Sequence, residues 1–203
     1  PRWFFRMRYG EAASFLASGQ NVRPTRLLEA GFRFVKPTIE DFFEGTDHAA
    51  VDRLDLHRYM GTWYEIARFD HRFERGLSEV TATYTLMPDG TVRVENRGCK
   101  HKKPYDVCKT AEGRAKIPDP SQPGKLKVSF FLSFYSDYYV LELDQDEYNY
   151  ALIGSSSDKY LWILSRAPIL PEEIKKKLLD AATRRGYDVK KLIWVEQREK
   201  KIM

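Results

Sequence analysis

The feature that most constrains this chain is a change in hydrophobic periodicity at residue 61, where a period of two begins. From there, eight short segments rich in β-branched and aromatic residues are separated by turn signals such as Pro88-Asp89-Gly90. The segments are Gly61–Phe69, Val80–Met87, Val92–Asn96, Lys109–Ile117, Leu126–Phe131, Tyr138–Leu143, Tyr150–Gly154 and Tyr160–Ser165. Short strands at near-regular spacing predict an up-and-down barrel or a sandwich.

One clear helix follows the strands. Pro171 stands at its first turn and Gly186 ends it, with acidic residues near the start and arginines near the end. Its apolar stripe must pack on another surface. The stripe consists of Ile174, Leu178, Ala181 and Ala182. Leu192–Val195 then predicts a ninth, short strand, and this order fits a barrel with a single helix on its outer wall.

Composition excludes several classes of protein. Hydrophobic residues make up 42% and charged residues 31%, which rules out wholesale disorder. No run approaches 18 apolar residues, so we expect no transmembrane helix and only indirect membrane association. The net charge of +5 arises largely within residues 171–203, where a solvated helix face explains it better than a nucleic-acid site.

Enzyme signals are poor. No two glycines stand one residue apart, so the chain lacks a Gly-x-Gly nucleotide loop. The four histidines show no ligand or triad spacing, and we expect neither a metal nor a cofactor. Cys99 and Cys108 are too few for a disulfide scaffold, and either a hairpin disulfide or two reduced thiols fit the spacing.

Three local patterns coincide along the strands: Gly61-Thr62-Trp63-Tyr64-Glu65, the turn around Asp146 and Tyr148, and Leu161-Trp162-Ile163-Leu164-Ser165-Arg166. Their order and spacing resemble the lipocalin family over residues 51–197, closest to the bacterial outer-membrane lipocalins and apolipoprotein D. The resemblance implies an all-β fold, an eight-stranded antiparallel up-and-down barrel with one C-terminal α-helix on its outer wall. It also implies structural roles for the motif residues Gly61, Trp63, Asp146, Tyr148 and Arg166.

Alternation along the strands supports this resemblance. Trp63 would face inward near the closed end, where Arg166 lies over its ring in a cation–π pair of about 0.5–2 kcal/mol. We interpret the two residues as a structural plug and not as a catalytic pair. The same alternation predicts an apolar and aromatic wall suited to an acyl chain, with a filled core as the alternative. The wall residues are Tyr84, Val128, Phe130, Tyr139, Leu141 and Trp162.

The resemblance to lipocalins implies that the loop after the first strand lies over the open mouth of the barrel. Phe73 would form an apolar rim there, and Arg68 or Arg72 would meet a phosphate or carboxylate head group. Ordinary surface arginines are the alternative interpretation. We therefore expect a non-catalytic carrier of a fatty acid, lysophospholipid or similar amphiphile.

The first 43 residues carry a second resemblance. The segment Leu16–Phe34 is similar to the C-terminal tail of nucleotide-sugar epimerase-like short-chain dehydrogenases. This divides the chain into an epimerase-tail-like helical segment (1–43), a linker (44–50), the barrel (51–197) and a basic tail (198–203). The alternative function is then a lipid-binding accessory module at the C-terminus of an NAD(P)-dependent epimerase-like enzyme.

Short helices are expected in the first segment at residues 11–18 and Pro24–Ala30. Because this segment is too apolar for a free tail, we expect it to dock either on the barrel or on a second copy, which would make a homodimer. The epimerase-like segment slightly favours the cytoplasm, whereas lipocalin relatives favour the periplasm or the outer membrane.

Overall fold

The computed structural model describes residues 25–29, 31, 45–101, 105–131 and 134–198. The chain divides into two units, residues 1–37 and 38–203. In the first unit the description covers a helix, α3 (Thr25–Glu29), which falls within the predicted helix Pro24–Ala30. The helix expected at 11–18 and the docking expected of residues 1–43 lie outside the described residues.

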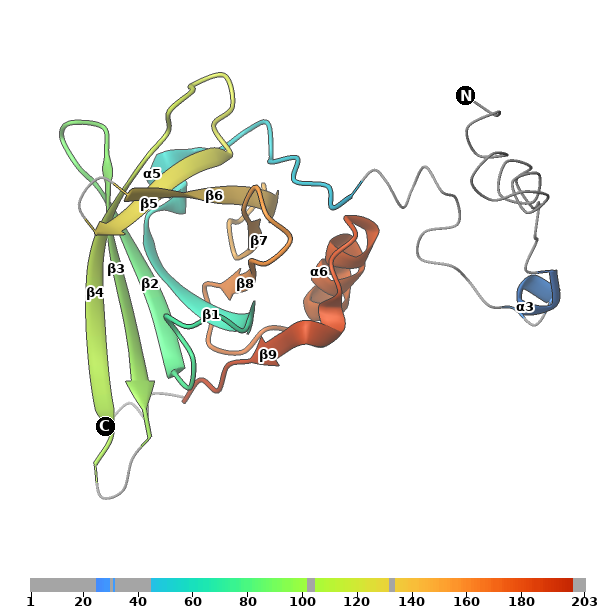
Figure 1. The fold of residues 1–203 in the computed structure, drawn as a ribbon. Helices are drawn as coiled ribbons and strands as arrows, with labels where there is room; N and C mark the ends of the chain where they lie inside the picture. The colour runs from blue at the N-terminus through green and yellow to red at the C-terminus, as the bar shows by residue number, and fades with distance from the viewer. Residues whose placement is uncertain (1–24, 30, 32–44, 102–104, 132–133, 199–203) are drawn as a thin grey trace, which may run out of the picture. The chain divides into compact units, whose positions relative to one another are not determined.

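The second unit is a closed antiparallel β-barrel, as predicted (Figure 1). The sheet order is β2-β3-β4-β5-β6-β7-β8-β1-β9, and β1 also pairs with β2, which closes the barrel. The strands are β1 (Gly61–Phe69), β2 (Ser78–Leu86), β3 (Val92–Lys100), β4 (Val107–Lys116), β5 (Lys125–Phe131), β6 (Phe134–Leu143), β7 (Tyr150–Gly154), β8 (Leu161–Ser165) and β9 (Leu192–Trp194).

Strands β3 and β4 pair in unbroken register from Val92 opposite Ala115 to Lys100 opposite Val107. This long hairpin carries β3 four residues beyond the predicted end at Asn96. Cys99 and Cys108 face each other in that register and form a disulfide. Of the two states that the sequence left open, the structure therefore has the disulfide.

Helices cover one end and one side of the barrel. The short α5 (Leu56–Tyr59) begins at Asp55, whose carboxylate accepts hydrogen bonds from the next turn, and it places Tyr59 in the barrel core. The longer α6 (Glu172–Arg184) lies against the outer wall (Figure 1) and is followed by η1 (Val189–Lys191). No helix within the described ranges is long and apolar enough to cross a membrane.

The apolar core has two layers, separated by the sheet. The inner layer fills the barrel around Trp63, Tyr84 and Val140, and the outer layer joins the wall to α6 through Leu141 and Leu178. Each strand contributes side chains to both layers because successive side chains point to opposite faces of the sheet. Inner residues are therefore the candidates for contact with a ligand, whereas outer residues hold the helix.

On strand β6, the prediction of two wall residues was wrong. Tyr139 and Leu141 belong to the outer layer, and Leu141 is 1% exposed beneath α6. The register between β6 and β7 shifts between Val140 and Glu142. This irregularity reverses the alternation along the strand, so that Leu143 faces inward while Leu141 faces outward. The predicted alternation had assumed one unbroken period of two.

Candidate functional site

The closed end of the barrel is held by one arginine. The Arg166 guanidinium lies 3.9 Å from the centre of the Trp63 ring, and Trp63 is completely buried. Four hydrogen bonds fix the guanidinium. They run from Nε to the Tyr148 carbonyl (3.3 Å), from Nη1 to the Thr62 carbonyl (3.0 Å), and from Nη2 to the carbonyls of Arg58 and Met60 (both 2.7 Å). These contacts suit a rigid floor for the barrel.

The other motif residues gather around that floor. Gly61 has a positive φ of 91°, and a side chain there would approach Arg166 Nη1 at 3.4 Å. Tyr148 is buried, and its hydroxyl accepts a hydrogen bond from the Asp55 amide at 3.0 Å. The Asp146 carbonyl accepts a hydrogen bond from the Arg58 guanidinium, which also lies over the Tyr148 ring. The contacts of Tyr148 and Asp146 tie the β6–β7 turn to α5 and its cap residue.

A second arginine lies inside the barrel near its mouth. Arg68, on β1, is 1% exposed, and its Nη1 donates to Glu65 Oε1 at 2.5 Å. Nη2 donates to the backbone carbonyls of Glu74 (2.7 Å) and Leu77 (3.1 Å) in the loop after β1. The buried Nε has no acceptor among the described residues. Arg68 therefore keeps one hydrogen-bond donor available inside the barrel.

The two carboxyl groups beside Arg68 titrate differently. Burial, together with the charge of Glu74, raises the pKa of Glu65 to about 8 despite the ion pair with Arg68. Burial also acts against ionised Glu74, but the hydrogen bond and charge of His71 outweigh it and lower the pKa of Glu74. At neutral pH the site thus holds one ionised and one protonated carboxyl group beside the guanidinium.

Aromatic rings surround this polar cluster. Trp162 Nε1 donates to Glu74 Oε2 at 3.2 Å, and the Trp162 ring stacks on Tyr160 with 5.8 Å between ring centres. The His71 ring lies 5.4 Å from the ring of Trp162 and 6.2 Å from that of Phe73. Phe73 is 70% exposed, as its predicted place on the rim requires. Arg72 lies over the Phe73 ring, away from the buried cluster.

The structure places the predicted wall residues in two groups. Tyr84, Val128 and Trp162 belong to the inner layer, and the last two keep partial exposure there. Phe130 stands near the end of β5, where it is 44% exposed and lines a surface depression of about 460 Å³ with Phe131. A side chain at Gly113, the strand partner of the inner-layer residue Val94, would meet the Phe130 ring, so Phe130 stays on the predicted face of the wall.

Sequence patterns predicted Tyr84 in the wall but missed that its hydroxyl group meets those of Tyr59 and Tyr138 in the inner layer. The Tyr138 hydroxyl lies 2.6 Å from that of Tyr59 and 3.0 Å from that of Tyr84. Tyr59 precedes the first strand, so no strand periodicity indicated it. Because Tyr139 was predicted to face inward, its neighbour Tyr138 was expected to face outward. The buried Glu65 was missed as well, although it stands two residues after Trp63 on β1 and therefore points to the same face of the strand.

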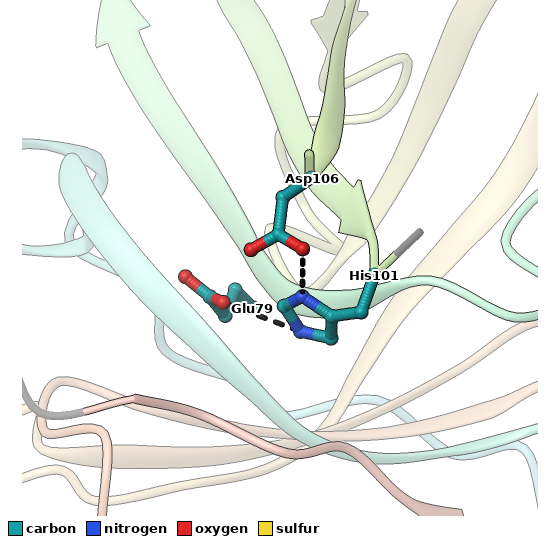
Figure 2. Close-up of side chains that lie close together, drawn as sticks. All are labelled: Glu79, His101 and Asp106. Atoms are coloured by element: carbon teal, nitrogen blue, oxygen red, sulfur yellow. Dashed lines mark ion pairs between the residues drawn. The ribbon is translucent and has the colours of Figure 1, made fainter. Parts of the chain in front are cut away.

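Outside the barrel, a charged cluster joins β2, the β3–β4 hairpin and the C-terminal segment. His101 lies between Glu79 (3.3 Å from Nε2) and Asp106 (2.9 Å from Nδ1), as Figure 2 shows. Arg198 contacts both carboxylates, at 3.4 and 3.1 Å. The carboxylates approach opposite nitrogens of one ring, and a guanidinium already balances their charge. The arrangement therefore suits an ion-pair cluster better than a metal centre.

A closed eight-stranded barrel, an outer helix and a Trp–Arg floor together define a class of binding protein. A family model described as a lipocalin-like domain matches residues 54–197. The chain belongs to the lipocalin family, and the resemblance seen in its motifs is confirmed. This family places the barrel among binding proteins.

Two curated proteins and one solved structure illustrate how similar this chain is to other members of the family. The outer membrane lipoprotein Blc of Escherichia coli (strain K12) is 50% identical over 147 residues, which covers 72% of this chain and 81% of that protein. Apolipoprotein D of Mus musculus is 34% identical over 154 residues, covering 72% of this chain and 78% of that protein. Among solved structures, insecticyanin from Manduca sexta has a TM-score of 0.61 at 23% identity, covering 76% of this chain and 87% of that chain.

The N-terminal residues match a different model. Residues 1–45 fit a domain of unknown function, DUF1731. The boundary of this match lies within two residues of the end of the predicted first segment. The two matches leave residues 46–53 between them, and the match of the N-terminal residues to a separate domain agrees with the epimerase-tail-like resemblance of the first segment.

Proposed function

We propose that the barrel binds and carries a single-chain amphiphile, a fatty acid or lysophospholipid, with its acyl chain inside and its polar head near the mouth. The observation that carries this proposal is Arg68, a buried guanidinium inside the barrel with an Nε–H that no described residue accepts. A buried donor without a partner is unfavourable, so an oxygen of a bound head group would satisfy it. Carboxylate and phosphate groups are the acceptors that a guanidinium binds most strongly.

The charge balance near the mouth favours an anionic head. Because Glu65 is protonated at neutral pH, Glu74 is the ionised carboxylate facing Arg68 and His71. An incoming anion would therefore meet one buried negative charge and not two. Trp162 and His71 would cover the head, since their rings already pack together above the cluster.

The wall below the cluster suits an acyl chain. Val128, Tyr138 and Trp162 lie in the inner layer and remain partly exposed, which indicates accessible surface inside the barrel. Burial of an acyl chain against such a wall contributes about 0.8 kcal/mol per methylene before ordering costs are subtracted. This gain supports a long-chain ligand over a short one.

The test compares two arginine variants of the full chain. Arg68→Met should weaken binding of hexadecanoic acid about tenfold or more, because the carboxylate loses a charge-assisted partner. Arg114→Met is the matched control, since Arg114 is exposed and pairs with Asp89 on the outside. Displacement of a fluorescent fatty acid would report both affinities. Equal affinities for the two variants would contradict the proposed head-group site.

A second candidate function has one specific observation in its favour. The DUF1731 match to residues 1–45 agrees with a barrel that acts as a lipid-binding accessory module of an epimerase-like enzyme. The native reading frame would then extend upstream through a Gly-x-x-Gly-x-x-Gly nucleotide loop. Sequencing that frame and measuring NAD(P)H binding by its product would test this candidate. A reading frame without the loop would contradict this candidate, and the carrier function would remain as the single proposal.

A further inference from the structure

Three tyrosines meet near the closed end of the barrel. They come from α5 (Tyr59), β2 (Tyr84) and β6 (Tyr138), and two hydrogen bonds link their hydroxyl groups through Tyr138. The Tyr59 ring stacks on that of Tyr84 and lies 5.0 Å from the ring of the plug residue Trp63. Tyr59 and Tyr84 are 2% and 8% exposed. The three hydroxyl groups, here called the tyrosine triad, therefore stand above the Trp63 floor.

A count of protons shows that the triad is incomplete. Each hydroxyl group has one hydrogen to donate and can accept two hydrogen bonds. Two hydrogen bonds within the triad use two of its three hydrogens, whichever way the groups rotate. The hydroxyl groups contact no other acceptor among the described residues. One O–H donor of the triad therefore always remains for a group outside the described residues.

The triad stays neutral in the physiological range. Burial raises the pKa of Tyr84 to about 12 and holds the pKa values of Tyr59 and Tyr138 well above the ordinary value. The triad thus offers a hydrogen-bond donor but no positive charge. An uncharged oxygen, such as a hydroxyl or carbonyl oxygen, is the acceptor that can enter this site with the least loss of hydration.

We propose that the tyrosine triad binds a hydroxyl or carbonyl oxygen at the inner end of the ligand chain, so that the barrel prefers long-chain amphiphiles oxygenated far from the head group. This inference rests on the proposed carrier function, with the head held by Arg68 at the mouth. Arg68 is near the mouth end of β1 and Tyr59 is on the helix at the closed end, while Tyr84 of the triad lies close enough to Glu65 and Glu74 for their charges to act on its hydroxyl group. A chain between them would have a polar contact at each end.

The experiment compares hexadecanoic acid with 16-hydroxyhexadecanoic acid on the full chain, by displacement of a fluorescent fatty acid. The wild-type protein should bind the hydroxy acid about two- to tenfold more tightly, the net value of one hydrogen bond. The variant to test replaces all three tyrosines by phenylalanine, because any single replacement still leaves a free donor. It should reverse the preference, since the ligand hydroxyl would then be buried without a partner.

Tyr150→Phe is the control, because the Tyr150 hydroxyl accepts a hydrogen bond from Lys177 on the outside of the barrel. This variant should keep the wild-type preference. Equal binding of the two acids by the wild-type protein, or an unchanged preference in the triple variant, would overturn the inference while leaving the carrier function intact. Failure of both acids to bind the wild-type protein would contradict the carrier function and the inference together.

Discussion

At the closed end of the barrel, Arg166 donates four hydrogen bonds to backbone carbonyls and covers the ring of Trp63. At the mouth, Arg68 is buried and pairs across the sheet with a tryptophan position, yet its Nε has no acceptor among the described residues and its carboxyl partner Glu65 has a raised pKa. The Trp63–Arg166 pair is therefore a satisfied structural joint. The mouth retains unmet polar groups, which is how a binding site differs from a core.

The largest effect should come from the closed end. Trp63→Ala would leave a void beneath the barrel and remove the ring that Arg166 covers, at a cost of about 3–5 kcal/mol in the free energy of unfolding. Trp162→Ala should cost less, because Trp162 is only half-buried at the mouth. Thermal melts of both variants would measure the difference. A Trp63→Ala melt within a degree or two of wild type would show that the plug is not structural.

An outer-layer substitution should separate stability from binding. Leu141→Ala would leave a cavity between the wall and α6 and should lower the free energy of unfolding by about 2–4 kcal/mol. Ligand affinity of the folded variant should not change, because Leu141 faces away from the barrel interior. Val128→Ala is the inner counterpart and should weaken fatty-acid binding instead. Weaker binding by Leu141→Ala at a temperature where it is folded would place the ligand elsewhere.

A pH series should test the buried carboxyl group of Glu65 beside Arg68. Glu65 keeps its proton in the folded state up to about pH 8, whereas in the unfolded chain it ionises near its ordinary value of 4.5. The folded state therefore binds more protons between these values, and the free energy of unfolding falls as pH rises through this window.

Glu65→Gln removes that titration. Between pH 5 and pH 8 the variant should lose about 1–3 kcal/mol less stability than wild type. Urea unfolding at both pH values provides the measurement, and the difference between the two proteins cancels the contributions of other groups. Parallel pH profiles for the variant and the wild type would mean that Glu65 is ionised in the folded protein.

Much of the fold could be predicted because strand periodicity and turn residues are local signals. The eight strands, the helix and the Trp63–Arg166 pair follow from such signals and from the lipocalin motifs. The errors at Tyr139 and Leu141 come from a register shift in β6, which a pattern of period two does not reveal. One irregular residue reverses the assignments on one side of it, so that Tyr139 and Leu141 face outward while Leu143 faces inward as predicted.

The polar part of the site was harder to predict. Arg68 was proposed as a contact for a head group, but its burial depends on a further irregularity in β1 between Glu65 and Ala67. In the tyrosine triad, Tyr59 is 25 positions from Tyr84 in the chain, and Tyr84 is 54 positions from Tyr138. Contacts over such separations are set by the closure of the barrel, and no local pattern encodes them.

The most direct test of a ligand inside the barrel is to fill the barrel. Val128→Trp adds a large ring to the inner layer, whereas Ile169→Trp adds the same ring to an exposed position on the outside. Titration with a fluorescent fatty acid, on variants shown to be folded by circular dichroism, should show at least tenfold weaker binding for Val128→Trp and wild-type binding for Ile169→Trp. Wild-type affinity in a folded Val128→Trp variant would contradict the carrier function of the barrel.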